Sequence, residues 1–149
     1  MKKKTVIMIG AVLAVSLAVT AYWLYGQAEA ELANNITREI RQEDFILHIR
    51  AERIDEGFQV FRSIQYFGDD TVEITHQTPL VSVSFKQQNH DYTGSTVAHT
   101  LKTGSSYYPQ NAKTFALPKK GVYTLFCEAR FSVKGEQKTI THEEELVFQ

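Results

Sequence analysis

The sequence predicts an all-β protein in which an N-terminal apolar helix precedes an antiparallel β-sandwich. Short runs of alternating apolar and polar residues follow one another through residues 44–149, and this period of two is that of strands with one buried face. Turn residues separate the runs at intervals of about 8 to 12 residues, with no amphipathic helix between them. Such a series of short strands is typical of two stacked antiparallel sheets.

Residues 1–28 are predicted to be a membrane anchor or a signal segment. Residues 5–26 contain no charged residue, follow three lysines and end in an aromatic cluster around Trp23. A spanning helix needs about 20 apolar residues, with flanking lysines on one side and interfacial aromatics on the other. We therefore expect a single-pass anchor in the cell membrane with an extracytoplasmic C-terminal domain. The alternative is a signal peptide and secretion after cleavage near Ala30, where Ala28-Glu29-Ala30 offers a small-x-small site.

Residues 29–43 are predicted to form a helical stalk or linker. Their composition shifts to Ala, Glu, Arg, Asn and Gln, and Leu32, Ile36 and Ile40 recur every four residues. Residues four apart lie on one face of a helix, so this spacing favours a helix with a narrow apolar stripe. The sandwich is therefore expected to begin at Asp44.

The strand pattern is clearest between residues 45 and 85. In the first run Phe45, Leu47, Ile49 and Ala51 stand at every second position and would share one buried face. A second run follows at residues 58–66 and a short third run at residues 72–74. Pro79 is expected to separate the third run from a fourth at residues 81–85, because proline cannot donate to a strand ladder. Weaker runs at residues 97–101 and 115–117 complete the series before a closing hairpin.

The last residues, 121–149, predict a hairpin of two long strands. Every second residue is apolar from Tyr123 to Val133, and on the second strand Ile140, Leu146 and Phe148 are in phase. The polar break at residues 134–137 contains Gly135, which can adopt a positive φ and let the chain reverse. An isolated hairpin is only marginally stable in water, so the earlier strands must cover its apolar face.

Three segments together resemble the immunoglobulin-like domains of bacterial extracellular proteins: Ser63-Ile64-Gln65-Tyr66-Phe67, Leu101-Lys102-Thr103-Gly104-Ser105-Ser106-Tyr107 and Leu117-Pro118-Lys119-Lys120-Gly121-Val122-Tyr123-Thr124-Leu125. Among these domains the chain is similar to the bacterial intracellular proteinase inhibitor (BsuPI-like) family. The resemblance implies an immunoglobulin-like β-sandwich for residues 44–149 and, as an alternative function, a proteinase-inhibitor-like module. It implies no particular site residues.

The charge balance argues against a nucleic-acid partner. Three of the 16 Lys and Arg residues and one of the 17 Asp and Glu residues precede residue 31, which leaves 13 basic and 16 acidic residues in the rest of the chain. No strand pattern places the basic residues on one face, whereas nucleic-acid binding requires a basic patch.

The residues with catalytic or metal-binding chemistry do not form a recognisable motif, so we expect no enzyme, no cofactor and no metal. Cys127 is the only cysteine, and its apolar register predicts a buried, inert thiol. The five histidines lack the close spacing of a metal site, although a loop could bring His90 and His99 together. Glu143, Glu144 and Glu145 predict a solvated strand edge. A metal-dependent or hydrolytic enzyme is the less expected alternative.

Aromatic side chains in loops are the remaining candidates for function. Tyr92 lies in a polar loop, and Tyr107 and Tyr108 precede Pro109. Tyrosine provides a large contact area at low entropic cost, so these three residues are the predicted binding residues. We expect a non-catalytic, membrane-anchored binding module of a bacterial cell envelope, whose partner is an envelope protein or a cell-wall polymer.

Overall fold

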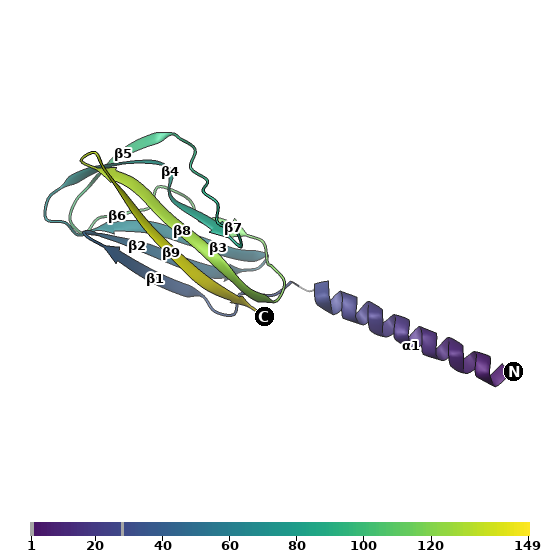
Figure 1. Cartoon of the computed structure of the whole chain (residues 1–149). Helices are drawn as coiled ribbons and strands as arrows, with labels where there is room; N and C mark the ends of the chain where they lie inside the picture. The colour runs from purple at the N-terminus through teal and green to yellow at the C-terminus, as the bar shows by residue number, and fades with distance from the viewer. Residues whose placement is uncertain (1, 28) are drawn as a thin grey trace.

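The computed structural model describes residues 2–27 and 29–149, which form one helix followed by strands in two antiparallel sheets (Figure 1). The elements are α1 (Lys2–Gln27), β1 (Ile36–Gln42), β2 (Phe45–Ile54), β3 (Gly57–Tyr66), β4 (Val72–Phe85), β5 (Thr96–Leu101), β6 (Ser106–Tyr107), β7 (Lys113–Phe115), β8 (Gly121–Val133) and β9 (Glu136–Phe148).

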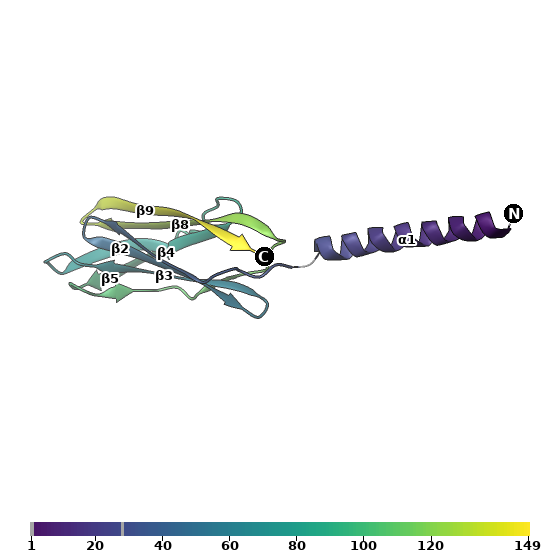
Figure 2. The same ribbon diagram turned by 90° about the horizontal axis from the view of Figure 1, so that it is seen from below.

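The two sheets form the layers of a β-sandwich, whose strands run lengthwise in Figure 2. One sheet has the order β1-β2-β3-β6, with β7 also paired to β3, and the other has the order β5-β4-β8-β9. Between them lies one apolar core to which most of the strands contribute. Phe45 of the first sheet meets Phe131 of the second with ring centroids 4.7 Å apart. The predicted all-β antiparallel sandwich is therefore confirmed.

The period-two pattern places the side chains as expected. Phe45, Leu47, Ile49 and Ala51 of β2 are all buried, and Cys127 lies on the buried register of β8. Strands β8 and β9, of 13 residues each, form the predicted hairpin. Their connection is the two-residue loop Lys134-Gly135, in which both residues have positive φ. Such loops match the twist of the strands they join.

The prediction of a helical stalk at residues 29–43 is wrong. Residues 36–42 form strand β1, which pairs with β2, and Leu32 is buried in the core with 2% of its surface exposed. A spacing of four fits a strand as well as a helix, because residues an even number apart share one face of a strand. Ile36 and Ile40 accordingly pack against the core from one face of β1.

Pro79 does not separate two strands. Strand β4 continues through it, and its register with β8 shifts between His76 and Val81, where a β-bulge absorbs the irregularity. Proline is tolerated at a bulge because the ladder is already interrupted there. The expected strand at residues 115–117 lies slightly earlier, as β7.

The prediction of a single-pass membrane anchor is contradicted. Among the residues that the structure describes, no helix combines the length and apolar character needed to cross a membrane.

The alternative of cleavage near Ala30 stays a prediction, and the structure places this residue in the sandwich. Ala30 is 5% exposed and its backbone N–H donates a hydrogen bond to the Pro118 carbonyl at 2.9 Å. Residues 30–33 are therefore an integral part of the sandwich.

Candidate functional site: an aromatic groove on the outer face of the first sheet

A shallow groove of about 310 Å³ lies on the solvent face of the first sheet, where β1, β2 and β3 meet the segment that follows β6. We call it the outer groove. Its surface is mainly apolar although the sheet face around it is polar. The side chains that shape it are those of Thr37, His48, Arg50, Phe61, Ser63 and Tyr108.

Phe61 forms the floor of the outer groove. In β3 the buried register is Phe58, Val60, Arg62 and Ile64, so Phe61 is an aromatic residue on the solvent register. The Arg50 guanidinium lies over its ring, 4.4 Å from the centroid, and Arg50 Nε contacts Glu52 Oε1 at 3.0 Å. Stacking on an aromatic face and a carboxylate contact hold the guanidinium flat, so the floor is a preorganised surface.

Tyr108 forms one wall and is 72% exposed. Two residues further on, Gln110 fixes the segment that bears it. The Gln110 amide nitrogen donates to the Arg62 carbonyl at 2.9 Å, and its oxygen accepts from the Leu80 backbone N–H at 3.2 Å. Because Gln110 ties this segment to both sheets, the exposed Tyr108 ring stands on a fixed backbone.

His48 closes the other side of the outer groove but both of its ring nitrogens are already in contact with acceptors. Nε2 is 2.9 Å from Gln65 Oε1, and Nδ1 is 3.4 Å from Glu39 Oε1. These contacts hold the imidazole on the sheet surface. His48 therefore shapes the side of the groove and does not offer a free hydrogen-bond donor to a ligand.

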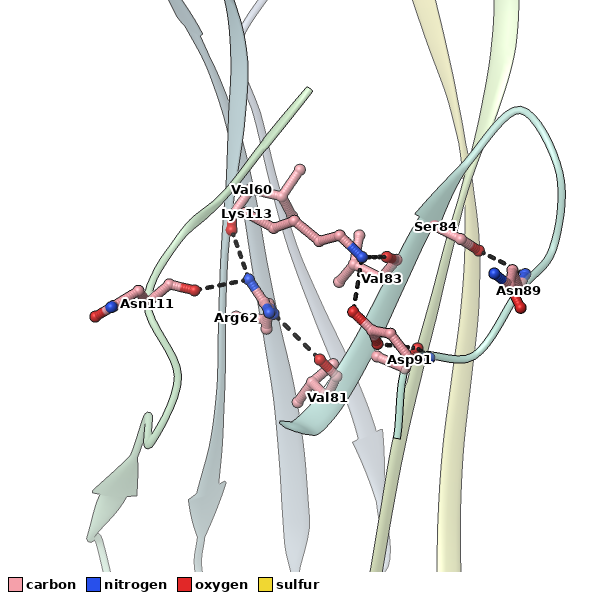
Figure 3. Close-up of polar contacts among 10 residues, drawn as sticks. Val60, Arg62, Val81, Val83, Ser84, Asn89, Asp91, Asn111 and Lys113 are labelled. Atoms are coloured by element: carbon pink, nitrogen blue, oxygen red, sulfur yellow. Dashed lines mark hydrogen bonds and ion pairs between the residues drawn. The ribbon is translucent and has the colours of Figure 1, made fainter. Parts of the chain in front are cut away.

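Behind the outer groove lies a partly buried polar cluster (Figure 3). Strand β5 pairs only with the first half of β4, and the cluster stands beside the second half, where a neighbouring strand is missing. Arg62 is 8% exposed and points into the sandwich. Its guanidinium donates to three carbonyls, those of Val81 at 3.1 Å, Asn111 at 2.9 Å and Val60 at 3.3 Å. These bonds tie β3 to β4 and to the segment that precedes β7.

Lys113 extends the same cluster. Its Nζ donates to the Val83 carbonyl and to Asp91 Oδ2, both at 2.7 Å, and Asp91 Oδ1 accepts from the Ser82 hydroxyl at 2.8 Å. Burial lowers the pKa of Arg62, although nearby Asp91 opposes that change. For Asp91, burial acts to raise the pKa, but hydrogen bonds from Lys113 and Ser82 outweigh it and the net pKa is lowered.

The three predicted binding tyrosines do not come together, and only Tyr108 lines the outer groove. Tyr107 points between the sheets. Its hydroxyl is 2.9 Å from His76 Nε2. The His99 ring stacks on the Tyr107 ring, with the two centroids 3.9 Å apart. Burial raises the pKa of the Tyr107 hydroxyl. Tyr107 thus packs between β4, β5 and β6.

Tyr92 lies against the second sheet. Its hydroxyl donates to the Glu128 carbonyl at 2.8 Å, and the Arg130 guanidinium lies 4.5 Å from its ring centroid. Burial, followed by the nearby Glu128 carboxylate, raises the pKa of Tyr92 well above its ordinary value. The polar loop is therefore folded back onto β8 through Tyr92.

The side chains with reactive chemistry are also held in structural contacts. Cys127 is 3% exposed, and burial raises the pKa of its thiol to about 12. Ser82 is 2% exposed and its hydroxyl is bonded to Asp91. His90 stacks on Tyr92 with ring centroids 5.8 Å apart, while His99 stacks on Tyr107, so the loop does not unite the two histidines. Within residues 2–27 and 29–149, no three His, Cys, Asp or Glu side chains converge as metal ligands.

Sequence reasoning missed Phe61, Arg50 and Gln110. A signal existed for Phe61, because an aromatic residue on the polar register of a strand is expected to be exposed. The positions of Arg50 and Gln110 beside the groove depend on strand pairing and on the path of the loop after β6, which no local pattern indicates.

No protein-family model and no curated protein matches this chain in sequence comparisons. The properties of the outer groove therefore provide the basis for a functional proposal.

Proposed function

We propose that the protein is a non-catalytic binding module that docks a protein partner on the outer groove. The observation on which this rests is the pairing of the exposed Tyr108 with Phe61 on a surface whose backbone and guanidinium are already fixed. A partner that binds such a surface immobilises few additional side chains. Each side chain that is already ordered before binding saves about 0.5 to 1.5 kcal/mol of binding free energy.

The composition of the groove supports a protein partner over a polysaccharide. Tyrosine, phenylalanine and arginine are the residue types enriched in the centres of protein interfaces. The groove walls are mainly apolar, and the polar groups of His48 and Arg50 are already engaged by neighbours on the same sheet. An apolar or aromatic side chain of the partner, inserted between Phe61 and Tyr108, is the best match to a groove of about 310 Å³.

The environment of the reactive side chains supports the non-catalytic part of the proposal. A nucleophile requires access to substrate and a nearby base. Cys127 has neither a lowered pKa nor an exposed sulfur, and Ser82 is buried against Asp91.

We also propose that the sandwich is of the immunoglobulin-like type. Strand β3 pairs with β6 and β7, while β4 pairs with β8, and such crossed pairings are typical of a Greek key. Tyr123, near the start of β8, donates its hydroxyl to the Lys119 carbonyl four residues upstream at 3.0 Å, as in a tyrosine corner. The likeness to the proteinase inhibitor family stays a prediction.

The proposal predicts that partner binding depends on Tyr108 and Phe61. Full-length protein immobilised on beads would be compared with Tyr108→Ala and Phe61→Ala, and the affinity of each recovered protein would be measured by titration. Truncation of a central aromatic residue costs at least about 1.4 kcal/mol, so we expect at least a tenfold loss of affinity for the specific partner.

Phe67→Ala is the matched control. Phe67 is also an exposed aromatic residue, at 39%, and it also has a guanidinium, that of Arg41, 5.9 Å from its ring, but it does not line the outer groove. Equal binding by all three variants and the parent protein would refute the assignment of the outer groove.

A further inference from the structure

Strand β5 forms an open edge of the second sheet (Figure 1). Its residues 96–100 are exposed, and among the described residues its backbone is hydrogen-bonded only within the ladder to β4. The strand Thr96-Val97-Ala98-His99-Thr100-Leu101 contains no Lys, Arg, Asp, Glu or Pro. An edge of this kind presents a row of free backbone donors and acceptors that an additional strand can pair with.

The other edges of the sandwich are protected. Residues 31–33 cover the end of β9, through backbone hydrogen bonds to Val147 and Gln149. The rest of β9 contains charged residues, among them Lys138, Glu143 and Glu145. Strand β1 has charged residues at Arg38, Glu39 and Arg41, and charges disfavour edge-to-edge pairing. Strands β6 and β7 have only two and three residues, too few to form a long ladder.

The open half of β4 is protected in a different way. Arg62 and Lys113 donate to the carbonyls of Val81 and Val83, as described above. Every long edge except that of β5 is thus covered, charged or satisfied by side chains. Because natural sheets usually protect their edges, an uncharged and uncovered one indicates an interaction site.

We infer that β5 pairs antiparallel with β5 of a second copy of this chain, with the two-fold axis passing through Ala98. When two copies of one strand extend a sheet, residues that pair across the interface point to the same face of that sheet. Side chains alternate between the faces along each copy, so the numbers of two paired residues must differ by an even number. The register centred on Ala98 satisfies this condition. It places Thr96 opposite Thr100, Val97 opposite His99, and Ala98 opposite Ala98 of the second copy.

The chemistry of this register favours self-association. Threonine pairs on one face can exchange hydroxyl hydrogen bonds, and the small Ala98 side chains allow the backbones to meet at the axis. No like charges lie opposite one another, and Val97 and His99 remain on the core-side face, where His99 keeps its stack on Tyr107. The interface is small, so the dimer is weak and reversible.

A cysteine substitution tests both the pairing and its register. Ala98 would face its own copy at about 4.5 to 5.5 Å between Cα atoms, within the range for a disulfide. Thr96 of one copy would face Thr100 of the other. The two Thr96 residues would therefore be four positions apart along the paired strands, about 13 Å, which is beyond disulfide reach. Under mild oxidation the full-length Ala98→Cys variant is expected to form covalent dimers at least ten times faster than Thr96→Cys.

Thr96→Cys is the matched control, because both positions are exposed and lie on the same face of β5. The native Cys127 is buried and serves as an internal background in both variants. Similar rates for the two variants, or no covalent dimer from Ala98→Cys, would overturn the inference.

Sedimentation of the protein without added cysteines provides a second measurement. The parent protein is expected to show concentration-dependent dimerisation, and Ala98→Asp is expected to weaken it at least tenfold, because two carboxylates would meet at the axis. A parent protein that remains monomeric at several hundred micromolar, or an Ala98→Asp variant that dimerises equally well, would contradict the pairing. The groove on the first sheet is not involved, so this inference is independent of the proposed function.

Discussion

Glu144 illustrates how a single residue joins the edges of the two sheets. The Arg38 guanidinium of β1 contacts both carboxylate oxygens, with Nε 2.9 Å from Oε2 and Nη2 2.7 Å from Oε1. His142 Nε2 lies 2.9 Å from Oε2, and the Glu144 side chain is only 11% exposed. The expectation of a solvated glutamate edge is therefore wrong for Glu144, because the edge of β9 faces β1 and not open solvent.

The Glu144 contacts predict a loss of stability in acid. Burial acts to raise the pKa of Glu144, but the hydrogen bonds from Arg38 and His142 outweigh it, and the pKa is below the ordinary value of 4.5. The unfolded chain then binds more protons, so this contribution is fully present well above pH 4.5 and is lost as the pH falls through the lower folded pKa. Denaturant unfolding at pH values from about 6 to about 3 should show this decline.

Glu144→Gln should flatten the decline, since the amide does not titrate in this window. Glu143→Gln removes the same charge from an exposed neighbour on the opposite face of β9 and is the control for the change of net charge. An equally steep decline in Glu144→Gln would show that other carboxylates dominate acid unfolding.

At the scale of elements, the β8–β9 hairpin is the best specified part of the fold. Its loop, Lys134-Gly135, has φ values of 51° and 80°. A two-residue loop with positive φ at both positions favours Asn-Gly, because asparagine tolerates the left-handed region better than lysine does. The alternation on the two strands and this loop together determine which residues pair.

Substitutions in the loop should therefore shift stability in opposite directions. Lys134→Asn is expected to increase the free energy of unfolding by about 0.5 kcal/mol, and Gly135→Ala to decrease it by about 1 kcal/mol. Both residues are exposed, so packing changes little. Thermal or denaturant unfolding measures both effects, and a stabilising Gly135→Ala would argue against the positive φ at this position.

At the scale of the whole molecule, the sandwich begins earlier than residue 44. Ala30 and Leu32 are buried in the core, and a short bridge joins Leu32 to Phe148 near the end of β9. Strand β1 then forms seven pairs with β2 and brings Arg38 to Glu144. The first and last segments of the sandwich thus depend on one another.

Truncation tests this boundary. A chain beginning at Glu29 should retain the stability of the sandwich to within about 0.5 kcal/mol, because no core contact is removed. A chain beginning at Asp44 loses Leu32 and strand β1, and the removal of Leu32 alone costs about 1.5 to 3 kcal/mol. Strand β1 also covers part of the core and supplies Arg38 to Glu144, and both contributions are lost. We therefore expect at least about 3 kcal/mol of destabilisation in total. Equal denaturant midpoints for the two chains would contradict the assigned boundary.

The sequence by itself determined the strands and which side chains they bury. Alternation is a local property, so the buried faces of β2, β3 and β8 and the hairpin turn could be predicted from neighbouring residues alone. The candidate tyrosines were found for the same reason, since aromatic residues in polar segments are visible locally. Only Tyr108 of the three lines the groove, because the direction of a loop side chain depends on what the loop packs against.

Only the tertiary structure decided where the segment before Asp44 belongs and which surface is available for binding. The spacing of Leu32, Ile36 and Ile40 fits both a helix and a strand, and β1 forms because β2 offers a partner edge. The burial of Arg62 and the groove between Phe61 and Tyr108 arise from contacts between residues far apart in the sequence. Such contacts follow from the pairing of whole strands, and the pattern within one strand does not contain them.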